Sequence, residues 1–458
     1  MTNSIHQTHS GMSRISRRDF LKTAGLLSGG LALAACGNLQ DRLVETPNIV
    51  MIISDDQAWG DYGFMGHEVI QTPRLDQLAS ESVVYPRGYV TAPLCCPSLA
   101  SIVTGLYPHQ NKITSNDPPL VGKGARFQVR EWSEERKQLR REMIAHIDEV
   151  PTLPQMLKQR NYVSLQTGKW WLGNYSRGGF TNGMTHGDME RGGRHGDEGL
   201  VIGRETMQPI YDFIESAGNQ PFFIWYAPFL PHRPHDPPER ILERYRDQTD
   251  SIHLARYWAM CEWFDQTCGE LLAYLDHQGI TENTMVLYVG DNGWIQQPDA
   301  SGYAPRSKRT PYEGGVRTPI MVRWPGHMTP RWEESLPASS IDLAVTALRA
   351  SGLDPTSAMQ GVGLLDRAAV AAREAVFGAD YTHDAVDIND PRSSLQHTWT
   401  VTDPWKLILP AAPNIPDGKP ELYNLTDDPN EMKNLADGHP EQVRRLQERI
   451  RLWWQGAG

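Results

Sequence analysis

The stretch Asn48-Ile49-Val50-Met51-Ile52-Ile53-Ser54-Asp55-Asp56 decides the fold, because an apolar run ends there on two adjacent carboxylates. A second apolar run, Met285-Val286-Leu287-Tyr288-Val289, leads into Asp291-Asn292. Apolar runs of this length predict buried strands. Two strands that each stop on oxygen-bearing side chains can assemble one cation site from remote segments, although the same residues could also cap the helices that follow.

From Asn48 onward, strand-like apolar runs alternate with amphipathic helical stretches. The pattern predicts helices at 72–81, 152–160 and 253–276, and strands at 222–226 and 320–324. Such alternation predicts an α/β sandwich around a large, mostly parallel central sheet. Sheets of this kind bind ligands beyond the carboxyl ends of their strands, which is where the two polar pairs fall.

The pattern changes after about residue 365. Short strand-like segments at 398–402, 405–409 and 421–425 precede a terminal helix at 440–454, whose apolar residues share one face. We therefore divide the folded part into a large domain, 47–365, and a smaller C-terminal subdomain, 366–458, with an antiparallel sheet and a helix packed on it.

The first 36 residues read as an export signal. Ser16-Arg17-Arg18-Asp19-Phe20-Leu21-Lys22 is a twin-arginine pattern, and the short apolar stretch after it ends in Leu33-Ala34-Ala35-Cys36, which is typical of a bacterial lipobox. A plain signal peptide with a chance cysteine is the alternative. With 37–46 as a tether, the pattern predicts a periplasmic or cell-surface protein that meets the membrane only through a lipid on Cys36.

The composition restricts the partners. The chain has 458 residues and a formal charge of −11, from 44 basic and 55 acidic side chains. An acidic protein of this kind is not expected to bind nucleic acid nonspecifically. A local pocket can still be basic, so anionic small molecules and glycans stay open as substrates. The sequence gives no indication of oligomeric state.

Four oxygen-bearing side chains (Asp55, Asp56, Asp291, Asn292) without a nearby Cys–His pattern favour Ca²⁺ or Mg²⁺ over zinc. Between the two pairs lies Cys95-Cys96-Pro97-Ser98. Pro97 suits the first position of a helix to Leu106, with Cys96 as its N-cap. Exposed amides there favour negative charge, so Cys95 could face a sulfuryl or phosphoryl group. A buried apolar cysteine is the alternative.

Three basic side chains stand in well-marked surroundings, namely Lys169 after a strand-like segment, His232 in a proline-rich turn and Lys308 in a Gly- and Pro-rich loop. Beside a metal they could neutralise charge on a transferring group. The glycine-rich segment 173–199 reads as a long loop, in which Arg191, Arg194, His195 and Asp197 could contact the substrate. The charged segment 128–148, with Arg140-Arg141 in its middle, reads as a solvated helical excursion near the site, with contact to a polyanion as the alternative.

These motifs, in this order, resemble the formylglycine-dependent sulfatases of the alkaline phosphatase superfamily, and the likeness covers nearly all of the chain after residue 45. The matching segments are Pro47-Asn48-Ile49-Val50 through Asp55-Asp56, Thr72-Pro73-Arg74-Leu75-Asp76, Thr91-Ala92-Pro93-Leu94-Cys95-Cys96-Pro97-Ser98, Thr104-Gly105-Leu106-Tyr107-Pro108-His109, Thr167-Gly168-Lys169-Trp170, Asp291-Asn292-Gly293, Tyr312-Glu313-Gly314-Gly315, Glu421-Leu422-Tyr423-Asn424-Leu425 and Asp428-Pro429-Asn430-Glu431.

The resemblance implies an alkaline phosphatase-like fold and a sulfatase that acts on aryl or carbohydrate sulfates. It implies that Cys95 is oxidised to formylglycine, whose hydrate attacks sulfur. It also implies that Asp55, Asp56, Asp291 and Asn292 bind Ca²⁺. Lys169, His232 and Lys308 match groups that bind the sulfate and assist departure of the leaving oxygen.

Two positions depart from the family pattern. Leu99 stands where the family has arginine, and Trp171 stands where it usually has histidine. Neither replacement can act as a base. The nucleophile is therefore expected to be atypical: Cys95 could stay a thiol, be converted inefficiently, or use His109, His195 or His235 as its base. The alternatives to a sulfatase are a degenerate member that only binds sulfated glycans and a phosphodiesterase or phosphonate hydrolase. Trp171 could offer a sugar-stacking surface or be an ordinary buried aromatic.

Overall fold

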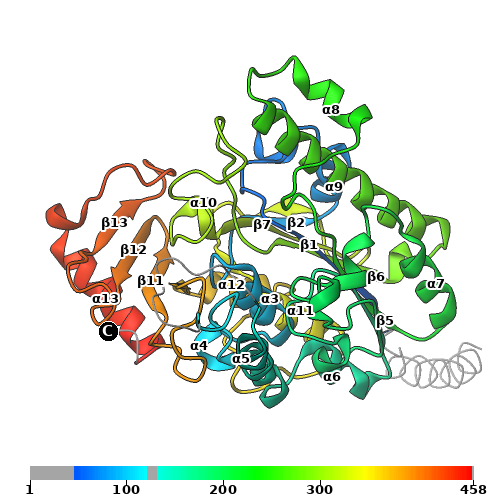
Figure 1. The fold of residues 1–458 in the computed structure, drawn as a ribbon, viewed down its shortest axis with the longest axis horizontal. Helices are drawn as coiled ribbons and strands as arrows, with labels where there is room; N and C mark the ends of the chain where they lie inside the picture. The colour runs from blue at the N-terminus through cyan, green and yellow to red at the C-terminus, as the bar shows by residue number, and fades with distance from the viewer. Residues whose placement is uncertain (1–45, 121–131, 456–458) are drawn as a thin grey trace, which may run out of the picture. The chain divides into compact units, whose positions relative to one another are not determined.

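The computed structural model describes residues 46–120 and 132–455, and its centre is a nine-stranded sheet (Figure 1). The predicted signal and nearly all of the tether lie outside the described residues. The strands follow the order β4-β3-β5-β1-β6-β7-β2-β8, and β9 pairs with β2. Their bounds are β1 Asn48–Ser54, β2 Val83–Tyr89, β3 Val163–Gly168, β4 Asn182–Gly183, β5 Phe222–Ala227, β6 Thr284–Gly290, β7 Arg317–Arg323, β8 Arg331–Trp332 and β9 Ala338–Ser339.

The sheet is mostly parallel, as the sequence predicts. β1 pairs in parallel with β5 and β6, β3 pairs in parallel with β5, and β7 runs against its neighbours β6 and β2. In the β1–β6 pair, Ser54 lies beside Gly290. The residues that follow these two strands therefore leave the sheet at the same edge.

Strand β1 is buried on both faces, which explains its uninterrupted apolar sequence. Successive side chains of a strand point to opposite faces. Ile49, Met51 and Ile53 accordingly join one apolar cluster, while Val50 and Ile52 join another. The first cluster includes residues of α3 Cys95–Thr104, α6 Leu153–Leu157 and α11 Asp342–Ala350, and the second includes residues of α2 Pro73–Ser80, α7 Gln208–Ala217 and α9 Ile252–His277.

The predicted elements match the observed ones with small shifts at their ends. The helix predicted at 253–276 is α9, and the helix predicted at 152–160 is α6 followed by a 3₁₀ turn, Lys158–Arg160. The strand predicted at 320–324 begins earlier, as β7. The remaining helices are α4 Pro108–Asn111, α5 Glu134–Ala145, α8 Glu239–Arg246, α10 Glu313–Val316, α12 Arg367–Ala372 and α13 Pro440–Trp453.

A second, four-stranded antiparallel sheet forms from β10 Val376–Tyr381, β11 Leu395–Thr402, β12 Trp405–Pro410 and β13 Glu421–Asn424. Leu446 and Ile450 of α13 pack on Leu407 and Leu422 of this sheet. The predicted architecture of an antiparallel sheet covered by a helix is confirmed, and both elements lie at one end of the ribbon in Figure 1.

A buried ion cluster fastens this second sheet to the rest of the fold. The Lys406 side chain on β12 is 0 % exposed, and its Nζ lies 3.0 Å from carboxylate oxygens of both Glu313 and Glu431. Glu313 begins α10, and its other oxygen accepts a hydrogen bond from Tyr89 of β2 at 3.2 Å. One lysine thus bridges two buried carboxylates from different segments.

We expect Lys406→Met to lower the free energy of unfolding by about 3–5 kcal/mol, because it leaves the buried Glu431 carboxylate without its cation. Glu313 then keeps the more distant Arg317 guanidinium, 3.7 Å away. Burial, opposed by Lys406, already raises the pKa of Glu431 to about 7. Urea denaturation measures the change. The exposed Lys433→Met is the control, and a Lys406 variant as stable as this control would contradict the assigned role.

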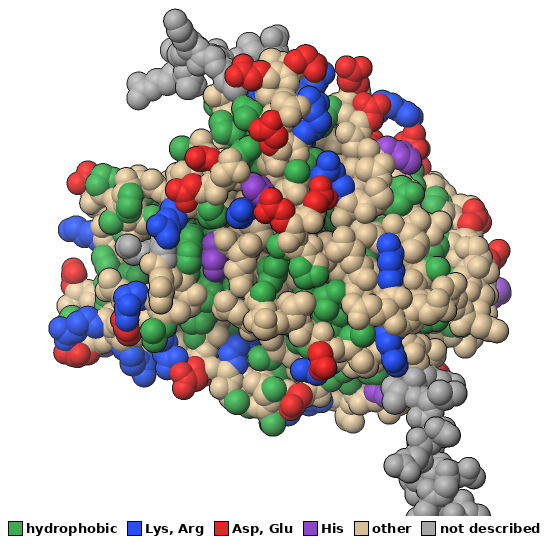
Figure 2. All heavy atoms as spheres, turned by 90° about the horizontal axis from the view of Figure 1, so that it is seen from below, with side chains coloured by type: hydrophobic (Ala, Val, Ile, Leu, Met, Phe, Trp, Pro, Cys, Tyr) green, Lys and Arg blue, Asp and Glu red, His purple; other side chains and the backbone are tan. Residues whose placement is uncertain are grey.

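On the face shown in Figure 2, acidic and basic side chains are scattered among hydrophobic and uncharged groups, without a large patch of one charge. Across 46–120 and 132–455, no helix is both long enough and apolar enough to span a bilayer.

Candidate active site

The carboxyl ends of three parallel strands, β1, β6 and β3, bring the predicted polar residues together, with β5 lying between β3 and β1. Asp55 and Asp56 follow β1, Asp291 and Asn292 follow β6, and Lys169 follows β3. All five side chains are buried, none more than 2 % exposed. Strand order and parallel pairing, rather than proximity in sequence, create this cluster.

Direct contacts hold the pair Asp55-Asp56 against the pair Asp291-Asn292. The backbone N–H of Asp56 donates to Asp291 Oδ1 at 3.0 Å, and Asn292 Nδ2 donates to Asp56 Oδ1 at 2.7 Å. Asp56 has a φ of 63°, in the left-handed region that a residue with a Cβ seldom adopts. Strain of this kind costs on the order of 1–3 kcal/mol and is typical of functional sites.

The cluster has the donor set of a site for a hard cation. Asp55 Oδ2, Asp56 Oδ2 and Asn292 Oδ1 are buried and have no hydrogen-bond partner among the described residues. Burial raises the pKa of Asp55 well above its usual range, with Lys169 opposing the shift and Asp291 adding to it. Carboxylate and amide oxygens are the ligands that Ca²⁺ and Mg²⁺ take in proteins, so these residues fit such an ion.

Two lysines reach the same cluster. Lys169 Nζ lies 2.5 Å from Asp55 Oδ1 and 3.4 Å from Asp291 Oδ2. Lys308 Nζ donates to Asp56 Oδ1 at 2.5 Å and to Cys95 Sγ at 3.3 Å. Burial opposes both charges, but the neighbouring anions outweigh it and raise both lysine pKa values, so both side chains stay protonated. Lys308 therefore links the carboxylates to the candidate nucleophile.

Cys95 opens helix α3, which begins and ends two residues earlier than predicted. The helix spans Cys95–Thr104 and its N-cap is Leu94, so the prediction of Cys96 as N-cap is wrong. The reason is tertiary, because the Asn116 side chain accepts the hydrogen bond of the Cys96 N–H at 2.9 Å. Burial, opposed by Lys169 and Lys308, raises the pKa of the Cys95 thiol to about 12.

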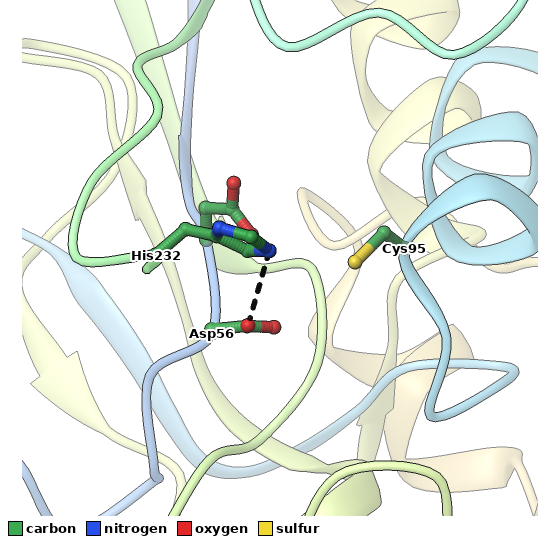
Figure 3. Close-up of side chains that lie close together, drawn as sticks. Asp56, Cys95 and His232 are labelled. Carbon is green, nitrogen blue, oxygen red and sulfur yellow. Dashed lines mark ion pairs between the residues drawn. The ribbon is translucent and has the colours of Figure 1, made fainter. Parts of the chain in front are cut away.

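His232 faces Cys95 across the site (Figure 3). Its Nε2 lies 3.4 Å from Asp56 Oδ2, and its Nδ1 donates to the Arg233 carbonyl at 2.5 Å. Burial, together with the charges of Lys169 and Lys308, lowers the pKa of His232 well below its usual value, so the ring is neutral. Ligating atoms of Asp55, Asp56, Cys95 and His232 all lie within 4.8 Å of one another.

A cavity of about 500 Å³ opens beside Cys95. Its lining includes His232, Lys308, Trp171 and His195, all four of which the sequence marks as site residues. Arg194, from the loop in which we expect substrate contacts, also lines it. The further lining residues, which the sequence did not reveal, are Asn116, Arg233, Pro234, Trp294, Ser301, Tyr303, Arg309 and His383. For Arg233 and Arg309 a signal existed, since each directly follows a predicted site residue. No local sequence pattern indicates that Asn116 and His383 line the cavity.

Trp171 lines the cavity but is 1 % exposed, and the Arg194 guanidinium lies 4.5 Å from its ring centre. Arg194 would have to move before a sugar could stack on that face of the indole. The ring of His195 meets Trp171 edge-on at 4.7 Å between centroids.

Of the three histidines considered as an alternative base, His195 is the one that lines the cavity. Burial and the charge of Arg194 lower the pKa of His195 to about 2, so this ring is unprotonated at neutral pH. His109 instead stacks on Trp454 at 4.5 Å, and His235 packs on Tyr257 and Trp294. Their rings belong to other packing clusters.

Helix α5 lies beside the site as predicted, but only one side of it is solvated, and Arg136, Arg140, Met143 and Ile144 are buried. The side chain of Arg140 is 2 % exposed, and its guanidinium donates to the carbonyls of Asn116, Trp171 and Arg194 at 2.8–3.1 Å. Arg140 thus hydrogen-bonds to three chain segments around the cavity. The adjacent Arg141 is exposed. Segment 121–131, part of which belongs to the predicted excursion, lies outside the described residues.

Leu99 is 1 % exposed and belongs to the apolar cluster beneath α3. We expect Leu99→Arg, which restores the residue typical of the resembling family, to lower the free energy of unfolding by roughly 3 kcal/mol or more, because a guanidinium would enter an apolar layer. Leu99→Met should cost less than about 1.5 kcal/mol. Thermal unfolding of both variants tests this. An arginine variant as stable as the methionine variant would contradict the prediction, because the guanidinium would then have to be paired with an acidic side chain.

The fold is an alkaline phosphatase-like sandwich, and the buried polar cluster lies at the carboxyl ends of its parallel strands. The chain belongs to the sulfatase family, whose model matches residues 47–353. A second model, the C-terminal region of N-sulphoglucosamine sulphohydrolase, matches residues 303–453. The protein is accordingly a sulfuric ester hydrolase.

Its relatives include human N-acetylgalactosamine-6-sulfatase, 28 % identical over 79 % of this chain and 73 % of the relative. Human arylsulfatase A is 27 % identical over 92 % and 88 %, and N-acetylgalactosamine-6-O-sulfatase of Bacteroides thetaiotaomicron is 25 % identical over 88 % and 92 %. A solved structure in complex with its substrate D-glucosamine-2-N,6-O-disulfate shares the fold, with a TM-score of 0.69 and 20 % identity over 90 % of this chain and 98 % of that one.

Proposed function

We propose that the protein hydrolyses a carbohydrate or aryl sulfate ester, through a nucleophile derived from Cys95 beside a divalent cation. The observation that carries the proposal is the convergence on Cys95 of Lys308 and a set of buried carboxylates with unpartnered oxygens. The names of the relatives, which specify N-acetylgalactosamine 6-sulfates, support a sulfated glycan as substrate.

Asp55, Asp56, Asp291 and Asn292 would hold the ion, and we propose Ca²⁺ rather than Mg²⁺. These side chains belong to loops that follow strands, and Ca²⁺ accepts irregular oxygen shells that Mg²⁺ does not. A divalent cation there supplies Lewis-acid stabilisation of charge on a sulfate oxygen.

Position 95 needs chemistry that a free thiol does not offer in this setting. A thiol with a pKa of about 12 is protonated at neutral pH, and the thiolate is the reactive form. Formylglycine at this position would supply, as its hydrate, an oxygen nucleophile. The chain's own contribution is to bury this position at the start of α3 and to place the Lys308 ammonium 3.3 Å from the side chain.

The remaining groups bind and orient the ester. Lys169, Lys308 and His232 surround the space next to Cys95, so a tetrahedral anion there would meet two fixed positive charges and one neutral imidazole. Preorganised charges in a buried site stabilise developing negative charge better than water does. His195 and Trp171 limit the space on the side of the glycine-rich loop.

Parallel assays with nitrophenyl sulfate, N-acetylgalactosamine 6-sulfate and bis(nitrophenyl) phosphate test the proposal, using protein from its native host. We expect turnover of both sulfates and much slower turnover of the phosphodiester. Faster hydrolysis of the phosphodiester would make the enzyme a phosphodiesterase. Tight binding of the sulfated sugar without turnover would indicate a member that has lost catalysis.

We also propose that the twin-arginine pattern and Cys36 make this an exported lipoprotein. The support is the order of the sequence features alone. Replacing Arg17 and Arg18 by lysine should trap the protein in the cytoplasm, and Cys36→Ala should release it from membranes on fractionation. Unchanged membrane association of Cys36→Ala would contradict the lipid anchor.

A further inference from the structure

The cavity beside Cys95 carries more positive charge than one sulfate group would neutralise. Arg194, Arg233, Lys308 and Arg309 line it, and within the described part of the chain no aspartate or glutamate does. The whole protein has a net charge of −11, so this concentration of cations is a local feature.

Two of the four cations already have carboxylate partners. Lys308 Nζ lies 2.5 Å from Asp56 Oδ1. Arg194 forms a two-point contact with Asp117, at 2.8 and 2.6 Å. A buried or half-buried arginine with two bonds to one carboxylate has its charge compensated within the protein.

Arg233 has no such partner. Its Nη1 donates to the Ser301 carbonyl at 2.8 Å, and its guanidinium lies 5.2 Å from the Trp294 ring centre. Neither contact neutralises the charge of the Arg233 guanidinium, and no carboxylate of 46–120 or 132–455 forms an ion pair with it. An arginine held in this way presents the rest of its donors to whatever enters the cavity.

Arg309 is exposed, and its side chain has no hydrogen bond or ion pair with any described residue. Its backbone is nevertheless fixed, because its N–H donates to the Pro93 carbonyl at 3.0 Å. Its φ of 68° lies in the left-handed region, which an arginine seldom occupies. The backbone thus adopts an unfavourable conformation at Arg309, directly after Lys308. The Arg309 guanidinium lines the cavity without a carboxylate partner.

We infer that Arg233 and Arg309, the outer arginine pair, form a second anion subsite. The substrate is then a glycan that carries another anionic group, sulfate or carboxylate, close to the ester that is cleaved. This inference rests on the proposed function, because it takes the first sulfate to lie between Cys95 and His232. Guanidinium groups bind sulfate-like and carboxylate groups through paired hydrogen bonds, and a cavity of about 500 Å³ has the size of a site for a small organic ligand rather than a single ion.

The test compares kcat/KM for N-acetylgalactosamine 6-sulfate with kcat/KM for its 4,6-disulfate, using the full enzyme from its native host. A second arm uses a 6-sulfated disaccharide whose added charge is a uronate carboxylate. We expect the wild type to prefer at least one doubly charged substrate by about tenfold to hundredfold, the range that loss of one or two charge-assisted hydrogen bonds corresponds to. The arm that shows the preference identifies the second group.

The ratio of kcat/KM for the doubly charged substrate to kcat/KM for the singly charged one should fall in Arg233→Gln and in Arg309→Gln. It should approach one in the double variant. The preference should also weaken at high salt in the wild type, because exposed charges are screened. Arg445→Gln, an exposed arginine of α13 outside the cavity, is the matched control and should keep the wild-type ratio. Thermal unfolding checks that each variant is folded. If a variant does not fold, the kcat/KM ratio of the wild type and its dependence on salt decide whether the second subsite exists.

A wild type that hydrolyses singly and doubly charged sugars equally well would overturn the second subsite and leave the proposed function intact. A doubly charged preference that survives in the double variant would overturn it as well. Absence of sulfate release from every substrate, nitrophenyl sulfate included, would instead overturn the proposed function and this inference with it.

Discussion

Cys95→Ala is expected to lower kcat for nitrophenyl sulfate by roughly 10⁴-fold or more, because removal of a covalent nucleophile leaves only binding and electrostatic stabilisation. The variant should still fold, since alanine fits the start of a helix and Cys95 makes one hydrogen bond, from Lys308. Steady-state kinetics on equal amounts of folded protein measure the loss.

Cys96→Ala is the matched control. Cys96 is equally buried and stands next in the same helix, but it does not line the cavity. Mass spectrometry of the peptide that spans Cys95 completes the experiment, because formylglycine lowers the peptide mass and reacts with aldehyde reagents, whereas a thiol does neither. Full activity in Cys95→Ala, or an intact thiol in a fully active enzyme, would contradict the proposed nucleophile.

Asp56→Asn is expected to lower kcat/KM by about 10²- to 10³-fold, through loss of the cation and of the charge that positions Lys308 and His232. The substitution keeps the shape of the side chain and removes its charge. It should also abolish stabilisation by Ca²⁺. In the wild type, a hundredfold excess of Ca²⁺ over its dissociation constant should add about 2.7 kcal/mol to the free energy of unfolding.

Thermal unfolding with and without Ca²⁺, Mg²⁺ or a chelator measures this difference. Asp354→Asn, an exposed carboxylate with 88 % side-chain exposure, should retain both the activity and the response to Ca²⁺. Equal Ca²⁺ stabilisation in Asp56→Asn and the wild type would place the ion elsewhere. A larger response to Mg²⁺ than to Ca²⁺ would correct the choice of ion.

Much of the site could be predicted because its residues follow strands. The apolar run that ends at Asp55 and the run that ends before Asp291 each mark a buried strand, and parallel strands meet at one edge of a sheet. Lys169 and Lys308 were recognisable from their motifs. This arrangement brings the pair Asp55-Asp56 into contact with the pair Asp291-Asn292, where the Asp56 N–H donates to Asp291 Oδ1 at 3.0 Å.

Other features depend on contacts between segments that carry no local signal. Arg140 looks like a surface residue in a charged helix, yet three carbonyl groups from remote segments bury it. Asn116 moves the start of α3 by accepting a hydrogen bond from Cys96. The sequence does not distinguish a sugar-stacking role for Trp171 from a role in the core. The structure shows that the Arg194 guanidinium already lies over its ring.

The sequence by itself determined the order of strands and helices, the parallel character of the main sheet, and the side chains that follow β1, β3 and β6. These features depend on local periodicity and on which residue types end an apolar run. Only the tertiary structure decided which cations are already paired with carboxylates and which remain for a ligand. The physical reason is that charge compensation depends on distances of a few ångströms between segments that the chain brings together only on folding.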